Sequence, residues 1–243
     1  VPPDGYYQGI QNVLDKYGIM FWADEVITGF GRTGNDFGCT TMEIKSPDMM
    51  TFAKQLSSAY MPISASAIRR DVYEAMIDQS ASAGAFGHGY TYSGHPVACA
   101  VALRVLEIYD RDEIFDRAST TGKYLQEQLS QFSSHPLVGE VRGSGLLAAL
   151  ELVPNKELNH QFKDGKVGGV AQKMAQDNGL LIRTVAGSSI GICPPLIITN
   201  NQIDELIDKL GDALDKTFQY CQTYNLLTAV SYTHLTLPTK QDV

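Results

Sequence analysis

The chain has 243 residues, with 27 acidic and 19 basic side chains and a formal net charge of −8. This acidic balance argues against nucleic acid and against an anionic membrane surface as partners. No apolar run approaches the ~18 residues of a membrane-spanning helix. The four cysteines are scattered without a C-x-x-C pair. That pattern argues against a zinc site or a disulfide framework and favours a reducing compartment, the cytoplasm.

The first half of the chain alternates strand and helix signals, which favours an α/β fold with a parallel sheet. Residues 28–34 hold three glycines and are expected to form a loop. Residues 79–95 are rich in Ser, Gly, Ala and aromatics and are expected to form a long loop, a kind of segment that is often functional. The predicted elements, in order, are a helix over 5–17 with Ile10, Val13 and Leu14 on one side, buried strands over 19–24 and 48–53, a strand over 63–68, and a helix beginning at Arg70.

The pattern changes in the second half. Pro96 suits the first turn of a helix, and Val97, Val101, Val105 and Ile108 recur at a spacing that predicts its buried face. Further on we expect a smaller α+β domain that begins near residue 112. Its predicted elements are a helix over about 113–132, a strand and turn over 138–145, strands over 146–153, 180–185 and 189–193, a helix over 166–178, and a helix capped by Thr199 with Ile203, Leu206, Leu210 and Leu214 on its core side.

Two charged residues follow the two predicted buried strands. Asp24 ends the apolar run 18–23, and Lys54 ends the run 49–53. In open α/β sheets, ligands bind where strands end. Pyridoxal phosphate needs an amine for a Schiff base and an acid at its pyridinium nitrogen. Each residue alone is more often a solvated or loop-capping side chain, but the pair, with a glycine-rich loop between, favours this cofactor.

Four separated motifs resemble those of class III aminotransferases, which are pyridoxal-phosphate enzymes of fold type I. The resemblance is to the C-terminal part of these enzymes, in particular the ω-amino acid–pyruvate aminotransferase group, and covers residues 1 to about 226. It implies part of the mostly parallel sheet of the large domain, over 1–111, and a small C-terminal domain over 112–228. The motifs are Trp22 to Gly34 (WADEVITGFGRTG), Phe52-Ala53-Lys54, Gly87 to Pro96 (GHGYTYSGHP), and Val141 to Leu146 with Pro194-Pro195-Leu196.

The resemblance also implies residue roles. Asp24 would hold the pyridine nitrogen protonated, and Val26 would pack against one face of the ring. Lys54 would bind the cofactor covalently and then move a proton as general base and acid. Thr91, with the backbone at Tyr90, would reach the cofactor phosphate of a neighbouring subunit, which implies a homodimer. From its residues alone, Thr91 reads as a hydroxyl that orders a loop.

Arg183 ends a predicted strand, where family members bind a substrate carboxylate with an arginine. Its alternative is a surface arginine on an edge strand. The chain departs from the family here, because residues 184–189 form a longer turn. It also has Gln55 and Ala59 where many members have glycine. Relatives that resemble the ω-amino acid–pyruvate group accept such a pattern, so Lys54 keeps its implied role.

Three other residues receive structural interpretations. His88 and His95 flank the long loop and could suggest a metal pair, but no third ligand is evident. The family context implies packing and loop order for both, and no metal site. Arg32 is expected to anchor its loop rather than contact substrate.

The implied activity moves an amino group from an amine or ω-amino acid to a 2-oxo acid, with pyruvate as the expected acceptor. The alternatives are a decarboxylase or an aminomutase on the same site, or an inactive truncated fragment that acts only as a binding or oligomerising module. Family members extend further at the N-terminus, where they hold the cofactor phosphate and stack an aromatic on its ring. Without those elements, the 243 residues are expected to be inactive on their own. Residues 229–243 are expected to be a non-native tail.

Overall fold

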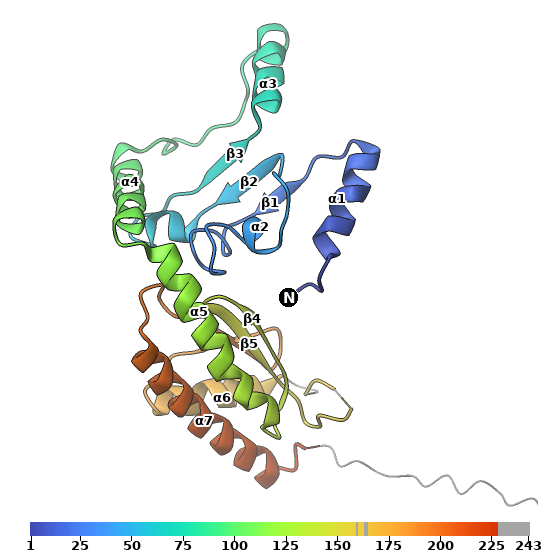
Figure 1. Cartoon of the computed structure of the whole chain (residues 1–243), viewed down its shortest axis with the longest axis vertical. Coiled ribbons are helices and arrows are strands. Elements are labelled where there is room, and N and C mark those ends of the chain that lie inside the picture. The colour runs from blue at the N-terminus through green and yellow to red at the C-terminus, as the bar shows by residue number, and fades with distance from the viewer. Residues whose placement is uncertain (159, 163–164, 228–243) are drawn as a thin grey trace, which may run out of the picture. The chain divides into compact units, whose positions relative to one another are not determined.

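The computed structural model describes residues 1–158, 160–162 and 165–227, and Figure 1 shows its helices and strands. The chain divides into two compact units. The first comprises Val1–Ser130, Arg142–Ala148 and Ile192–Glu205, and the second comprises Gln131–Val141, Ala149–Gly191 and the chain from Leu206 onward. The expected tail over 229–243 lies outside the described residues.

A three-stranded sheet forms the centre of the first unit, in the order β1-β2-β3. Its pairing is mixed, because β1 and β2 run parallel whereas β2 and β3 run antiparallel. The α/β elements therefore agree with the sequence, but half of the strand pairing in this sheet is not parallel. The strands are β1 (Trp22–Asp24), β2 (Met49–Phe52) and β3 (Ala65–Ile68), and the helices are α1 (Tyr6–Tyr17), α2 (Gly38–Thr41), the 3-10 helix η1 (Lys54–Ser57), α3 (Arg70–Ala83), α4 (Pro96–Arg111) and α5 (Ile114–Ser130).

The two strands that carry the candidate site are less buried than their apolar sequences predict. In β1 only Ala23 is buried, and Trp22 is 57% exposed. All four residues of β2 are half-buried. A strand is buried on both sides only where both faces of its sheet are covered. One face is covered by aromatic packing, since the ring of Phe52 lies 5.7 Å from that of Phe30 and 5.5 Å from that of Phe37.

The helices of the first unit form where the sequence predicts them but differ in which residues are buried. α1 has no buried residue, and Val13 on its apolar side is 55% exposed. α4 begins at Pro96 as predicted, but Val97 is exposed. Val105 is buried as predicted, and Val101 and Ile108 are half-buried. The other buried positions lie one residue further along the chain and include two alanines, which permit closer packing than valines do. The buried side chains of α4 are Ala98, Ala102, Val105 and Tyr109.

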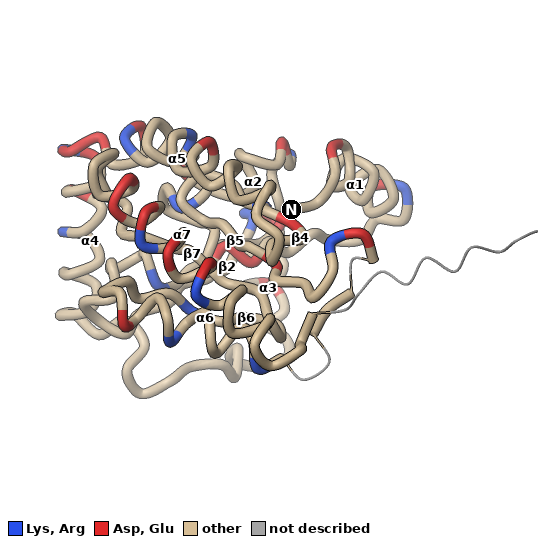
Figure 2. Tube along the Cα trace, turned by 90° about the horizontal axis from the view of Figure 1, so that it is seen from below, with Lys and Arg blue, Asp and Glu red and all other residues tan. Residues whose placement is uncertain are grey.

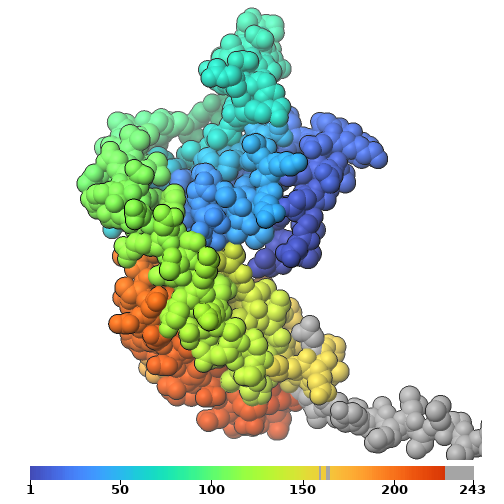
Figure 3. Space-filling model, in the orientation of Figure 1, coloured from blue at the N-terminus to red at the C-terminus, as the bar shows by residue number. Residues whose placement is uncertain are grey.

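α3 extends into the segment predicted as a long loop and ends only at Ala83. The hydroxyl of Ser80 donates to the carbonyl of Met76 at 2.8 Å, so this serine bonds within the helix. Gly84, with φ 94°, ends it. No residue of α3 is buried, and its atoms project from the rest of the first unit (Figure 3).

A four-stranded sheet lies largely in the second unit, in the order β4-β5-β7-β6. β6 and β7 form an antiparallel hairpin. The predicted core side of the last helix is confirmed, because Ile203, Leu206, Leu210 and Leu214 are all buried. The elements are the 3-10 helix η2 (Gln131–Ser134), β4 (Val138–Ser144), β5 (Leu147–Leu152), α6 (Lys166–Asp177), β6 (Arg183–Val185), β7 (Ser189–Ile192) and α7 (Asn200–Thr223).

Charged residues of both signs are spread along the helices, as on α5 in Figure 2. That helix alone carries Asp116, Arg117, Lys123 and Glu127. Such mixing is typical of a solvated face rather than of a block that binds one kind of charge. Within the described part of the chain, no helix combines the length and apolar character that crossing a membrane requires.

Replacing Leu210 by Ala is expected to lower the free energy of unfolding by about 2–5 kcal/mol, because it opens a cavity in a packed core. The side chain of Leu210 has no exposed surface. Leu181→Ala is the matched control: this leucine is 85% exposed, and the change should stay within about 0.5 kcal/mol. Urea denaturation followed by circular dichroism measures both. Equal losses would contradict this core.

Candidate active site

Asp24 and Lys54 lie at the same edge of the first sheet, the one formed by the carboxyl ends of β1 and β2. Asp24 is the last residue of β1 and pairs in register with Thr51 of the parallel strand β2. Lys54 begins η1, three residues after Thr51. Because β1 and β2 run in the same direction, both residues stand at the carboxyl ends of adjacent strands, where open α/β sheets bind ligands. Both side chains are exposed.

Asp24 keeps part of its carboxylate available. Its Oδ1 accepts a hydrogen bond from the backbone N–H of Val26 at 3.0 Å. Among the described residues, none donates to Oδ2. Side chains alternate along a strand, so Asp24 shares a face with Trp22, whose Nε1 donates to Thr51 Oγ1 at 2.7 Å. The acid can therefore accept a proton or a further hydrogen bond from a bound group.

Lys54 stands in an unusual stretch of backbone. Its φ is 44°, in the left-handed region, and Ser58 and Ala59 follow with φ 50° and 62°. Ala59 is one of the positions where the chain departs from the family's glycine, and its φ lies in the region that glycine favours. The hydroxyl of Tyr109 donates to the carbonyl of Gln55 at 2.9 Å. This bond fixes η1 next to the lysine.

Glu25, which the sequence reasoning passed over, is the buried carboxylate of the site, with 2% of its surface exposed. Its Oε2 accepts from the N–H of Gly38 at 2.8 Å, and its Oε1 accepts from the N–H of Cys39 at 2.7 Å. The hydroxyl of Thr28 also donates to Oε2, at 2.5 Å. Strand alternation puts Asp24 and Glu25 on opposite faces, but which of the two faces is covered follows only from the structure.

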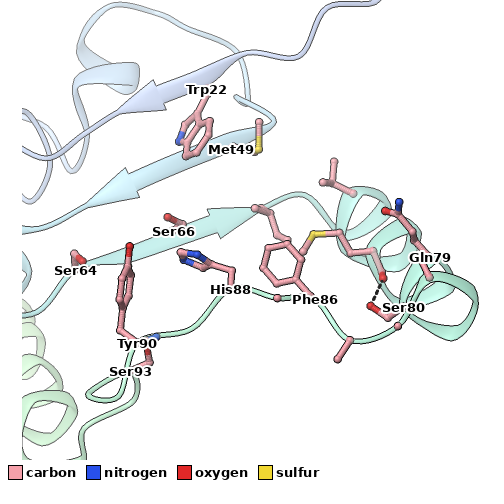
Figure 4. A pocket seen from close by; sticks show the side chains of 18 residues that line it. Trp22, Met49, Ser64, Ser66, Gln79, Ser80, Phe86, His88, Tyr90 and Ser93 are labelled. Atoms are coloured by element: carbon pink, nitrogen blue, oxygen red, sulfur yellow. Dashed lines mark hydrogen bonds between the residues drawn. The ribbon is translucent and has the colours of Figure 1, made fainter.

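A cavity of about 880 Å³ lies along β3 and α3 and reaches the first residues of β1 and β2 (Figure 4). Trp22 and Met49 line it from the sheet, α3 lines another side, and Phe86, His88 and Tyr90 line it from the loop. Neither Asp24 nor Lys54 is among its lining residues. In Figure 4 the Tyr90 and His88 side chains lie next to Ser64 and Ser66 of the sheet side.

Tyr90 and Thr91 lie on the exposed loop that follows α3. Tyr90 is 76% exposed, and its backbone N–H donates to the hydroxyl of Ser93 at 3.1 Å. That N–H is thus used within the loop. Thr91 is exposed, and its hydroxyl bonds to no described residue. Val26, the expected ring-packing residue, is half-buried next to Asp24.

Arg183 lies in the second unit, as the first residue of the edge strand β6. It pairs in register with Gly191 of β7. The side chain is exposed and forms no ion pair with a described residue. The longer turn noted in the sequence closes this hairpin through Ala186 and Gly187, with φ 42° and 82°.

Arg32 anchors its loop, as expected. It is buried, and its guanidinium donates to the carbonyls of Leu146 at 3.1 Å and Pro194 at 2.6 Å. The rings of His88 and Tyr90 lie 5.2 Å apart, which agrees with a packing role for the histidine. Across the described ranges, no group of three His, Cys, Asp or Glu side chains is arranged to hold a metal ion.

The donor set fits the two reactive ends of pyridoxal phosphate. Lys54, whose amine pairs with no described residue, can bind an aldehyde, and Asp24, an acid with an available oxygen, can pair with a pyridinium nitrogen. Both are exposed and stand on one edge of the sheet. An exposed hydroxyl at Thr91 suits a phosphate oxygen.

Comparisons with known proteins show the family of the chain. Residues 1–214 match the profile of the family described as aminotransferase class-III. A probable gamma-aminobutyrate transaminase 3 of Oryza sativa subsp. indica, named as mitochondrial, is 46% identical over 217 residues, which are 89% of this chain and 42% of that protein. A putrescine–pyruvate aminotransferase of Pseudomonas aeruginosa is 45% identical over 218 residues, 89% of this chain and 46% of its own length.

Solved structures show the same fold. The omega transaminase of Pseudomonas jessenii, in complex with PMP, superposes with a TM-score of 0.87 at 44% identity, over 90% of this chain and 48% of that chain. The chain belongs to the class III aminotransferases, pyridoxal-phosphate enzymes with the fold type I architecture. It spans about half the length of the relatives it matches.

The left-handed backbone near Lys54 yields a stability prediction. Ala59→Gly is expected to raise the free energy of unfolding by about 0.5–1 kcal/mol, because relief of an unfavourable φ exceeds the entropic cost of a glycine. Ala67→Gly in β3, where φ is not positive, is the control and should lower stability by a similar amount. Chemical denaturation measures both. Destabilisation by Ala59→Gly would contradict the strain at this position.

Proposed function

We propose that this chain carries the catalytic lysine of an aminotransferase that moves an amino group from an amine or ω-amino acid to a 2-oxo acid, with pyruvate as acceptor. The observation that carries the proposal is the parallel pairing that puts Asp24 and Lys54 on one sheet edge. Two relatives support the substrate class. One is named for gamma-aminobutyrate, an ω-amino acid, and the other for putrescine, a diamine, and pyruvate.

In this proposal Asp24, Val26 and Lys54 each have a distinct role at the cofactor. Bound pyridoxal phosphate would supply an electron sink for the carbon that exchanges its amino group. Asp24 would keep a proton on the pyridine nitrogen with its available carboxylate oxygen, and Val26 would support the ring. Lys54 would hold the cofactor and then move the substrate proton, as base and as acid.

Two further assignments concern substrate and subunits. We assign Arg183 to the substrate carboxylate, because an arginine without an ion pair can bind a carboxylate through two parallel hydrogen bonds. We assign Thr91 and the backbone at Tyr90 to the phosphate of a neighbouring subunit in a homodimer. The exposure of Thr91, whose hydroxyl bonds to no described residue, supports this assignment. The Tyr90 N–H would exchange its bond to the Ser93 hydroxyl for one to the phosphate.

The proposal also covers the domain boundaries of the chain and the cellular compartment in which it works. Residues 1–111 would belong to the large cofactor-binding domain and residues 112–228 to a small domain. The compartment would be the cytoplasm, because all four cysteines are free, which is typical of a reducing environment. Thiol titration of rapidly quenched cells checks that state.

Adding pyridoxal phosphate to the 243-residue chain tests whether these residues suffice. We expect no stable absorbance above 400 nm, because relatives are about twice as long and the phosphate-holding and ring-stacking elements expected from the family are not among these residues. A new band that is lost in Lys54→Ala would overturn this expectation.

A hybrid tests the activity itself. The N-terminal half of the Pseudomonas aeruginosa relative is joined to residues 1–226, and alanine formed from pyruvate is measured with putrescine or gamma-aminobutyrate as donor. Lys54→Ala should abolish alanine formation, and Asp24→Asn should reduce it by about 100-fold or more, which is the scale expected for a misplaced protonation state. Asp36→Asn on the same loop is the control.

The same assay separates the alternatives. Carbon dioxide release without alanine would indicate a decarboxylase. A rearranged donor formed without pyruvate would indicate an aminomutase. A hybrid that binds the cofactor but forms none of these products would contradict the proposal and favour a binding module.

A further inference from the structure

The proposed chemistry leaves one buried charged group of the site without a task. Glu25 stands between the two residues expected at the cofactor, Asp24 and Val26, yet its own side chain is 2% exposed and cannot reach a ligand on the open edge. A buried carboxylate is costly unless it is fully hydrogen-bonded. The hydrogen bonds of the Glu25 carboxylate therefore show which segments it holds together.

Three donors converge on the Glu25 carboxylate from two different segments. The N–H groups of Gly38 and Cys39 come from the start of α2, and the hydroxyl of Thr28 comes from the loop after β1. Hydrogen bonds to a charged group are stronger than those between neutral groups. The carboxylate thus ties the end of β1 to a helix that begins thirteen residues further along the chain.

The backbone of Glu25 is held as firmly as its side chain. Its N–H donates to the carbonyl of Thr51 in β2 at 3.0 Å, and its carbonyl accepts from the N–H of Gly29 at 3.1 Å. Gly38 leaves room for this arrangement, because a Cβ there would lie 2.7 Å from the Cβ of Thr28 and 3.1 Å from Glu25 Oε2. Glu25 is consequently fixed on every side.

The thiol of Cys39 also lies close to the Glu25 carboxylate. Burial raises the pKa of the Cys39 thiol to about 12, and a hydrogen bond to Glu25 and its negative charge add to the shift. The thiol therefore stays neutral at physiological pH. A thiolate at this position would repel the Glu25 carboxylate, and the neutral thiol avoids that repulsion.

Asp24, in contrast, has little that holds it directly. It is exposed, and among the described residues its carboxylate accepts one hydrogen bond, from the N–H of Val26, two residues away. Its direction therefore depends on the course of the backbone through residues 24 to 26. The hydrogen bonds of Glu25, the residue between Asp24 and Val26, set that course.

We infer that Glu25 is the positioning residue of the site: its buried carboxylate locks the turn after β1 onto α2 and thereby fixes the direction in which Asp24 presents its acid. Because side chains alternate along a strand, the Asp24 side chain is exposed at the ligand edge and the Glu25 side chain is buried in the protein. The inference rests on the proposed function, because only a bound cofactor makes the direction of Asp24 matter.

Nuclear magnetic resonance on the 243-residue chain tests this without cofactor. In Glu25→Ala, amide hydrogen exchange at positions 25 and 29 is expected to accelerate about 10- to 100-fold, the range that corresponds to loss of a bond to a charged group. Three-bond couplings should show one χ1 rotamer of Asp24 in the wild type and averaging in the variant. Exchange in β3 and α5 should stay unchanged.

Glu25→Gln covers the case in which the alanine variant does not fold. Its single amide oxygen can still accept from Gly38 and Thr28, but its NH₂ would face the N–H of Cys39. We expect an intermediate acceleration and partial rotamer averaging. Asp36 is the matched control, because its Oδ1 also accepts a hydrogen bond from α2, from the Thr40 hydroxyl at 2.7 Å, and one from the Phe37 N–H just before the helix at 3.0 Å. Asp36→Ala and Asp36→Asn should leave the Asp24 rotamer single.

Each remaining outcome counts against the inference. Averaging of Asp24 already in the wild type, unchanged exchange in both Glu25 variants, or the same averaging in the Asp36 variants would overturn it. Uniform acceleration across the chain would reduce Glu25 to a general stability residue. These readouts need no activity, so a hybrid without transamination would refute the proposed function while the positioning result still stands.

Discussion

The parallel pairing of β1 with β2 is the constraint on which the candidate site depends. It aligns Asp24 with Thr51 and brings the start of η1, with Lys54, to the same edge. Because side chains alternate along a strand, a slip of one residue would exchange the places of Asp24 and Glu25. The site would then direct its anchored acid outward and bury its available one. The three donors on Glu25 oppose such a slip.

Asp24 and Lys54 could be found from the sequence because each interrupts an apolar run at the point where a strand must end. Their meeting on one edge required only that the two strands be parallel neighbours. Glu25 could not be separated from Asp24 in the same way. Two adjacent acids look alike in a sequence, and only the register of β1 and the position of α2 decide which of them is buried.

The fold shows the same limit. The longer helices and the strands follow from periodicity, whereas the short α2 does not, and the core face of α7 was predicted residue by residue. Burial of β1 was not predicted correctly, because an apolar run says that a segment can be covered but not by what. In α4 Val105 is buried as predicted, but Ala98 and Ala102 are buried in place of Val97 and Val101. Shape, rather than hydrophobicity alone, selects the buried face.

The backbone around Lys54 joins the fold to the proposed chemistry. Three residues other than glycine, Lys54, Ser58 and Ala59, have left-handed φ values within six positions. Such conformations cost about 1–3 kcal/mol each and persist where the surroundings impose them. Here the Tyr109–Gln55 bond and the sheet supply that support. In the proposed reaction Lys54 would take and return a proton at one carbon, which requires its stem to be held in place. The strained backbone beside Lys54 and the hydrogen bonds of Glu25 would then both hold a reacting group at the carboxyl ends of the two strands.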